Sequence, residues 1–127
     1  MMIYHTTVKA VGSDVEAFAK KGFFITFGEP ALVSLKDFCY FVEVNPVMGE
    51  IKPGSRLVID EKEYKITEVG SIAAENLGKL GHLTVFFHGD RECLPGSICV
   101  EQDQMPELKA GSRISIIGLG CQKVIDL

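Results

Sequence analysis

The sequence is short of basic residues, long apolar runs and cysteine or histidine motifs, and each shortage excludes a class of protein. Lysine and arginine total 13 against 17 aspartate and glutamate residues, which gives a net charge of −4, and the basic residues do not cluster. Binding to a nucleic-acid backbone needs a concentrated basic surface, so no nucleic-acid partner is expected. No stretch approaches the roughly 20 apolar residues that span a bilayer, and residues 1–12 lack the features of a signal peptide. We therefore expect a cytoplasmic protein.

The cysteines and histidines form no recognised metal-binding motif. Their positions are Cys39, Cys93, Cys99 and Cys121 for the thiols, and His5, His82 and His88 for the imidazoles. There is no CxxC pair, and the histidines do not complete a zinc-finger spacing. Reduced, partly buried cysteines are the expectation in a cytoplasmic chain, with no disulfide, no metal and no cofactor.

What the chain does contain is a regular series of short strand patterns. Its 127 residues suit one domain over 1–127, and 46% apolar residues are enough for a real core. About eight short strands at roughly 8–12-residue spacing predict an all-β fold, either a small closed or partly closed β-barrel with two or three short helices or a sandwich. A barrel is favoured because few strands carry the charge or proline that protects an open edge. The predicted strands cover 3–11, 23–27, 38–44, 56–59, 64–69, 82–87, 95–100, 114–117 and 123–127.

A capping box predicts the first helix. Ser13 and Glu16 lie three residues apart, the spacing at which each side chain can bond the other's backbone amide. The helix is expected over Asp14–Lys21 and to end at Gly22, because glycine readily adopts the left-handed conformation. Residues 31–37 fit either one helical turn or a loop.

A second helix is predicted shortly after the middle of the chain. Ser71 is its candidate N-cap. Ala73, Leu77 and Leu80 recur with the spacing of one apolar helix face. Gly81 supplies the left-handed residue that ends the helix, and the chain then turns sharply into a strand.

Three glycine–serine turns precede strands and resemble one another. Ile51–Ile59 is echoed by Leu108–Ile116, and Pro95–Val100 is a shorter echo. Turns of this kind start strands around the rim of a small barrel. None fits a Walker loop or a dinucleotide-binding glycine motif, so turn formation explains them better than phosphate binding does. Shared turn chemistry alone could produce the similarity, and an internal duplication stays open.

His82 is the candidate catalytic residue whose position the local sequence fixes best. It lies between the turn at Gly81 and the strand, with Thr84 on the same strand face. An imidazole there could act as a nucleophile or an acid–base group near neutral pH, and a structural histidine at a strand edge is the alternative. His88 lies six positions further on, about 20 Å away in an extended strand, so these two histidines cannot share a metal, and His5 is isolated.

Several short segments match a known pattern in order and spacing along nearly the whole chain. In the central block these are Val69-Gly70-Ser71, Asn76-Leu77, Leu80-Gly81-His82, Thr84 and Gly89. Supporting matches are Ile3-Tyr4, Thr6-Thr7, Ile25-Thr26-Phe27, Cys39, Pro53-Gly54, Tyr64, Thr67, Pro95-Gly96 and Val100. Together they resemble the glucitol/sorbitol-specific enzyme IIA component of the bacterial phosphotransferase system (PTS).

That resemblance implies a small cytoplasmic β-barrel that carries a phosphoryl group. The group would come from the phosphohistidine of the carrier protein HPr and pass to the IIB domain of a glucitol permease, whose IIC component lies in the membrane, so contact with the membrane would be peripheral. His82 is the one histidine of this chain that matches a family histidine, and we expect it to be the transient acceptor, which makes the chain a phosphotransferase component with a phosphohistidine intermediate. Thr84 would lie beside the phosphoryl group, with the backbone amides near Gly81 as donors. No metal or nucleotide is expected in this step.

One departure from the family pattern leaves a second function open. Members often carry a histidine just after the position of Cys39, and the resemblance associates that histidine with the phosphocarrier role. Here the segment Cys39–Val44 reads CYFVEV, without histidine. The alternative is a non-catalytic regulatory or binding module on the same barrel, acting as a homodimer through exposed strand edges.

Overall fold

The chain's structure, a computed structural model, describes residues 1–28, 34–88, 93–101 and 103–118. Its strands are β1 (Met2–Val11), β2 (Phe23–Phe27), β3 (Tyr40–Val42), β4 (Arg56–Ile59), β5 (Lys62–Val69), β6 (Leu83–Phe86), β7 (Ser97–Val100) and β8 (Arg113–Ile117). The helical elements are α1 (Glu16–Ala19), the 3-10 helix η2 (Lys36–Phe38) and α2 (Ala73–Leu80). The strand predicted over 123–127 lies outside the described residues.

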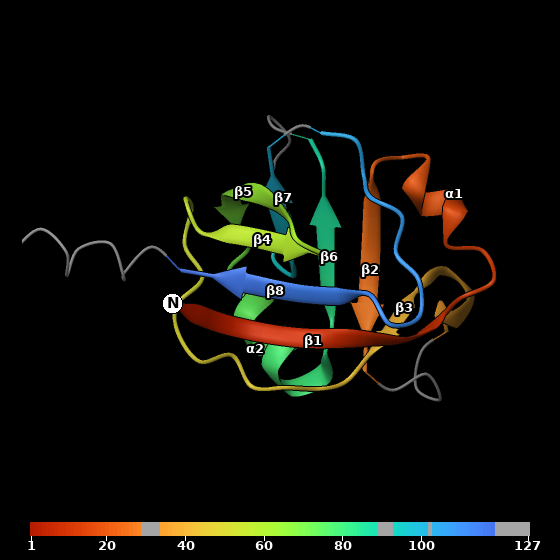
Figure 1. Ribbon diagram of the computed structural model, residues 1–127, viewed down its shortest axis with the longest axis horizontal. Coiled ribbons are helices and arrows are strands. Elements are labelled where there is room, and N and C mark those ends of the chain that lie inside the picture. The colour runs from red at the N-terminus through yellow and green to blue at the C-terminus, as the bar shows by residue number, and fades with distance from the viewer. Residues whose placement is uncertain (29–33, 89–92, 102, 119–127) are drawn as a thin grey trace, which may run out of the picture.

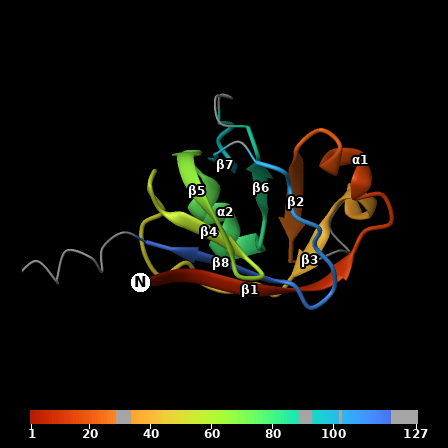
Figure 2. The same cartoon turned by 45° about the horizontal axis from the view of Figure 1, so that its top comes forward.

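The strands close into a barrel in the order β1-β3-β2-β6-β7-β5-β4-β8, which can be followed in two orientations (Figure 1 and Figure 2). The β2–β3 and β6–β7 pairs are parallel, and the other six pairs are antiparallel. This confirms the predicted barrel. Each described strand has a neighbour on both sides, so this ring offers no open edge for the strand-edge homodimer considered above.

Alternation along β6 separates the core from the outer surface. Leu83, Val85 and the following Phe87 belong to the core, whereas His82 and Thr84 are partly buried on the opposite face. This is the period of two predicted for the segment. Full burial of each large apolar side chain contributes about 1.5–3 kcal/mol, so the alternation fixes which face of β6 looks outward.

Helix α2 lies at one end of the barrel, beside the start of β6 (Figure 1). Ala73 and Leu77 pack into the core with 0% and 1% exposure, as predicted. Leu80, the third predicted member of the apolar face, is 45% exposed, and that part of the prediction is wrong. Ala73 and Leu77 therefore anchor the helix to the core, while the Leu80 side chain lies at the surface.

Both predicted side-chain caps are wrong. Ile72, not Ser71, is the N-cap residue of α2, and Val15, not Ser13, is that of α1; neither makes a side-chain capping bond. Backbone carbonyl groups of preceding residues accept the first amides instead, so the capping hydroxyls are not needed. Helix α1 is also shorter than predicted, with turns on both sides of its four residues.

The glycine–serine segments serve as turns. Gly54 and Gly111 have φ values of 97° and 96°, just before β4 and β8, which pair with each other. The hydroxyls of Ser55 and Ser112 are buried, and each accepts a hydrogen bond from the backbone amide three residues earlier, at 3.3 and 3.0 Å. These hydroxyls are used inside the turns, which supports turn formation over phosphate binding.

Candidate functional site

The end of α2 and the start of β6 hold His82 in place through backbone bonds. Gly81 has the left-handed conformation that was predicted, with φ of 67°. Its amide donates to the Leu77 carbonyl at 2.9 Å, and the amide of His82 donates to the Asn76 carbonyl at 3.3 Å. The chain therefore leaves the helix and enters the strand through a closed, hydrogen-bonded bend.

The bend is also fastened to the neighbouring strand. The Thr26 hydroxyl donates to the Gly81 carbonyl at 2.8 Å, and the Gly28 amide donates to the Leu80 carbonyl at 2.8 Å. A β-carbon on Gly81 would lie 3.1 Å from the Gly28 nitrogen and 3.3 Å from Val42 Cγ2. Position 81 thus has neither the backbone conformation nor the space that a side chain needs.

The His82 imidazole lies against an aromatic ring at the barrel surface. It stacks on Phe27 with ring centroids 4.5 Å apart and planes 15° from parallel. The side chain is partly buried, so it is neither sealed in the core nor fully exposed. Desolvation by this burial lowers the pKa of His82 below its ordinary value of 6.5. The imidazole is therefore mostly neutral at neutral pH, the form in which a ring nitrogen has a lone pair to attack with.

The two predicted supporting residues have different relations to His82. Thr84 lies two positions along the chain from His82, on the same outward face of β6, and is partly buried, so the two are same-face neighbours. Gly81 contributes its conformation, but its amide is already bonded within the bend, and so is that of His82. In this conformation neither amide is available as the donor that the family resemblance suggested.

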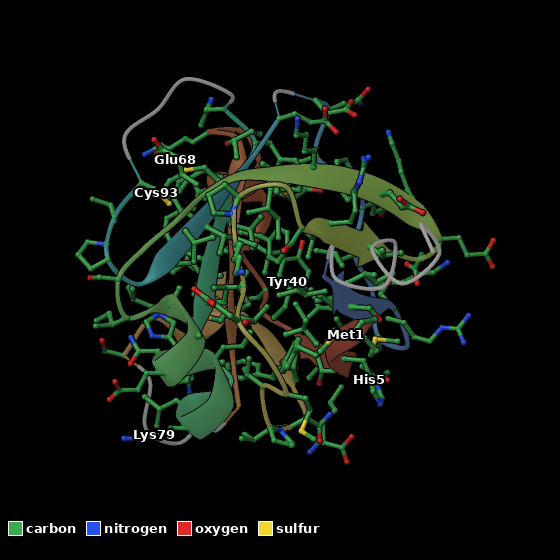
Figure 3. The ribbon with its side chains drawn as sticks, turned by 90° about the vertical axis from the view of Figure 1, so that its left-hand side faces the viewer. Met1, His5, Tyr40, Glu68, Lys79 and Cys93 are labelled. Carbon is green, nitrogen blue, oxygen red and sulfur yellow. The ribbon has the colours of Figure 1, made fainter. Side chains whose placement is uncertain are left out.

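The other two histidines have separate surroundings. His88 has Nε2 3.0 Å from the Lys21 carbonyl oxygen and lies in the polar segment after β6. His5 is exposed on β1, near Met1 in the view of Figure 3, and β1 is not a neighbour of β6 in the barrel. The structure therefore does not bring either histidine to His82.

The segment that follows Cys39 lies beside the His82 bend. It forms β3, which is shorter than predicted at both ends, because Phe38 belongs to η2 and strand pairing ends at Val42. Parallel pairing places Phe41 opposite Phe27, and Phe27 stacks on His82. Val42 is fully buried and borders the space at Gly81. The segment in which the family resemblance leads one to expect a histidine is thus next to His82, and in this chain Phe41 and Val42 lie there.

Sequence reasoning missed a second group of reactive side chains. Glu68, Cys93 and Cys99 bring one carboxylate oxygen and two sulfur atoms within 4.8 Å of one another. The two cysteines do not have the CxxC spacing, and Glu68 is 25 residues before Cys93. The pairing of β5 with β7, which no motif encodes, brings Glu68 to Cys99, and the turn before β7 adds Cys93.

Comparison with known proteins gives one consistent result. Residues 3–115 match the family described as the PTS system glucitol/sorbitol-specific IIA component. The glucitol/sorbitol-specific EIIA components of Shigella flexneri and Escherichia coli are each 31% identical over 112 residues, which cover 87% of this chain and 91% of theirs.

The fold is also found in a solved structure. The crystal structure of a PTS system IIA component from Enterococcus faecalis has a TM-score of 0.80 and 24% identity, covering 91% of this chain and 100% of that one. Among the described residues of this chain, no helix has the length and apolar character needed to cross a bilayer. On the match over residues 3–115 and the 31% identity to curated relatives, this chain belongs to the family of glucitol/sorbitol-specific IIA components of the phosphotransferase system.

Proposed function

We propose that this chain is a phosphocarrier of the PTS and that His82 is its transient acceptor. It takes a phosphoryl group from the phosphohistidine of HPr and passes it to the IIB domain of a glucitol/sorbitol permease. In this proposal it works in the cytoplasm and meets the membrane only through the IIB and IIC components. Family membership supports the role, and one observation carries the choice of residue: a partly buried, mostly neutral imidazole held by the Gly81 bend and by Phe27.

The transfer needs a nucleophile and good positioning more than acid–base machinery. The lone pair of a neutral His82 ring nitrogen attacks the phosphorus of phospho-HPr. A nitrogen–phosphorus bond forms at His82 as the bond in the donor breaks, and the donor imidazole leaves with the bonding electron pair. Transfer to IIB repeats the exchange with His82 as the leaving group. The lowered pKa keeps the attacking form populated.

Thr84 is proposed to orient the phosphoryl group by donating its hydroxyl hydrogen to a phosphoryl oxygen. Its place on the outward face of β6, two residues from His82, supports this. Replacing the hydroxyl by a methyl group in Thr84→Val should slow phosphoryl transfer by about 10-fold or more, and Thr84→Ser should restore most of the rate. A rate in Thr84→Val equal to the wild type would remove Thr84 from the mechanism.

A non-catalytic regulatory or binding module is the second candidate, and one observation favours it. Between Tyr40 and Val44, where related sequences often carry a histidine, this chain has none. Val42 is instead fully buried beside the bend. If that missing histidine was the family's acceptor, the barrel keeps its shape and has lost its transfer chemistry.

Labelling by phosphorylated HPr separates the two functions. The wild type is incubated with phospho-HPr, and the product is tested for phosphate that is acid-labile and base-stable, as phosphohistidine is. Three variants are compared: His82→Ala, and the controls His5→Ala and His88→Ala. The carrier proposal predicts label on the wild type and on both controls, and none on His82→Ala.

Two results would overturn the proposal, the first its carrier role and the second its acceptor residue. The first is an unlabelled wild type whose fold is intact by circular dichroism, which would favour the binding module. The second is full labelling of His82→Ala, which would place the acceptor elsewhere in the chain. Folding of His82→Ala is checked separately by its urea midpoint, so that loss of label cannot be confused with loss of structure.

A further inference from the structure

Three side chains of metal-binding types, one carboxylate and two thiols, converge on the outer face of the barrel, away from the His82 bend. They come from β5 (Glu68), the segment before β7 (Cys93) and β7 itself (Cys99). The carboxylate oxygen and the two sulfur atoms all lie within 4.8 Å of one another. Figure 3 shows Glu68 and Cys93 side by side at one edge of the molecule.

Strand pairing produces this convergence. Glu68 is directly opposite Cys99 in the antiparallel β5–β7 register, just after an irregularity between Ile66 and Glu68. Ile98 and Val100 point into the core, so Cys99 points outward between them. Cys99 is nevertheless 0% exposed. An outward-facing thiol is thus covered by its neighbours, with an exposed carboxylate at the entrance.

Backbone contacts hold Cys93 over this position. Its thiol donates to the Ser97 carbonyl at 3.3 Å. The Ser97 amide closes a turn on the Leu94 carbonyl at 3.0 Å, and the Gly70 amide donates to the same Ser97 carbonyl at 2.7 Å. The segment before β7 is therefore fastened to the end of β5, and Cys93 is positioned before any ligand arrives.

We propose that Cys93, Cys99 and Glu68 form a binding site for a thiophilic divalent cation of the Zn²⁺ class. Two thiolates and a carboxylate are a ligand set suited to Zn²⁺, whereas Mg²⁺ and Ca²⁺ prefer oxygen ligands alone. Tetrahedral geometry with zinc–sulfur bonds of about 2.3 Å places the sulfur atoms about 3.8 Å apart. The observed upper limit of 4.8 Å requires only a small side-chain adjustment. A water molecule would take the fourth position.

Cation binding at this cluster would be coupled to proton release. The exposed Glu68 carboxylate brings negative charge to the entrance. Binding converts two thiols to thiolates and releases their protons to the buffer, so affinity should rise with pH.

Titration of the reduced full chain with Co²⁺, a coloured substitute for Zn²⁺, tests the site directly. The wild type should bind one equivalent with thiolate-to-cobalt charge-transfer bands, and Zn²⁺ should displace the Co²⁺. The variants are Cys93→Ser and Glu68→Gln. Cys39→Ser is the matched control, because the buried Cys39 thiol donates to the Leu35 carbonyl and lies outside the cluster.

We expect Cys93→Ser to weaken binding by at least about 10–100-fold, the loss that even an outer-shell change can cause. Glu68→Gln should weaken it by about 10-fold, and Cys39→Ser should leave it unchanged. Alkylation of the wild type followed by mass spectrometry gives a second readout that needs no variant: Zn²⁺ should protect Cys93 and leave the Cys39 rate unaltered.

The site is refuted if the reduced wild type binds no Co²⁺ or Zn²⁺ at micromolar concentration. It is equally refuted if Cys93→Ser binds as the wild type does, or if Cys39→Ser loses binding to the same extent. A Cys93–Cys99 disulfide that forms in the presence of excess Zn²⁺ would also overturn it, because the thiols would then serve as a redox pair. None of these results depends on phosphoryl transfer at His82.

Discussion

His82 and the cysteine–glutamate cluster lie toward opposite ends of the paired strands β6 and β7. His82 precedes β6, and Cys99 is paired with Phe86 at the other end, four positions or about 13 Å away along the strand. Both groups face outward from the barrel. Local contacts between Asn76 and His82 form the bend of the first site, to which β2 adds a hydrogen bond and the Phe27 stack, whereas segments 25 or more residues apart assemble the second.

A site built from neighbouring residues can be predicted from the sequence more readily than one built from distant strands. A glycine bend after a helix is a local signal, so the mounting of His82 could be predicted from the order of residues alone. The register between β5 and β7 is a long-range property. A one-residue slip in that register would point Cys99 into the core and separate it from Glu68 and Cys93.

The largest expected loss of stability near His82 follows from truncating Leu77, the side chain that packs α2 against the core. Leu77 is 1% exposed, so Leu77→Ala should lower the free energy of unfolding by about 2–5 kcal/mol. Leu80→Ala in the same helix, at a side chain 45% exposed, should change it by less than about 0.5 kcal/mol. Urea denaturation measures both. Equal losses in the two variants would contradict the packing of α2 described here.

Gly70→Ala should disturb the cysteine end and leave the His82 end intact. A β-carbon at position 70 would lie 2.1 Å from the Leu94 carbonyl oxygen, so the backbone must shift, at about 1–3 kcal/mol. Cation affinity should fall while labelling by phospho-HPr is retained. Gly96→Ala is the control in the same segment, because its β-carbon would meet only the Asn76 side chain at 3.5 Å. Loss of both activities in Gly70→Ala would show that the two sites are coupled.

Gly81→Ala reverses that pattern. The left-handed φ of 67° and the close Gly28 backbone should make this substitution destabilising by about 1–2 kcal/mol, with slower labelling of His82 and unchanged cation binding. Gly78→Ala, inside the same helix with nothing nearer than 3.6 Å, should instead stabilise the protein by about 0.5–1 kcal/mol. Urea midpoints of the pair test the bend, and a neutral Gly81→Ala would contradict it.

The smallest expected effects are on the pH dependence of the free energy of unfolding. His82 should reduce stability as the pH falls, and Cys93 should reduce it as the pH rises. Burial lowers the pKa of His82 below 6.5, so the unfolded chain binds a proton first as pH falls through 6.5, and the wild type loses stability relative to His82→Gln. The pKa of Cys93 is raised from 9.0 to about 12. The unfolded thiol therefore ionises first above pH 9.0, and the wild type loses stability relative to Cys93→Ser. Urea midpoints across pH that moved the opposite way would contradict either shift.

Much of the fold was predictable because it follows from local patterns. Alternation in β6 and the left-handed glycines at 22, 54, 81 and 111 mark strands and turns that the structure confirms. The errors occur where tertiary contacts replace local ones. Ser13 and Ser71 do not cap their helices, since backbone carbonyls accept those amides. Leu80 has the right spacing for the apolar face, but its side chain is 45% exposed.

The candidate site was predictable only in part. Sequence placed His82, Gly81 and Thr84 together, and the structure adds the Phe27 stack and the lowered pKa of the imidazole. Those depend on the β2–β6 pairing, which brings two distant segments into register. For the same reason, the apolar Val42 beside the bend could not be inferred from its position in the chain.

Locating the phosphate on the protein tests the central claim most directly. The wild type is labelled by phospho-HPr, digested at neutral to alkaline pH, and fragmented by electron transfer in a mass spectrometer, which preserves the nitrogen–phosphorus bond. The account predicts one phosphoryl group, on His82. Phosphate on His5, His88 or any non-histidine residue, or none after HPr has been consumed, would contradict it.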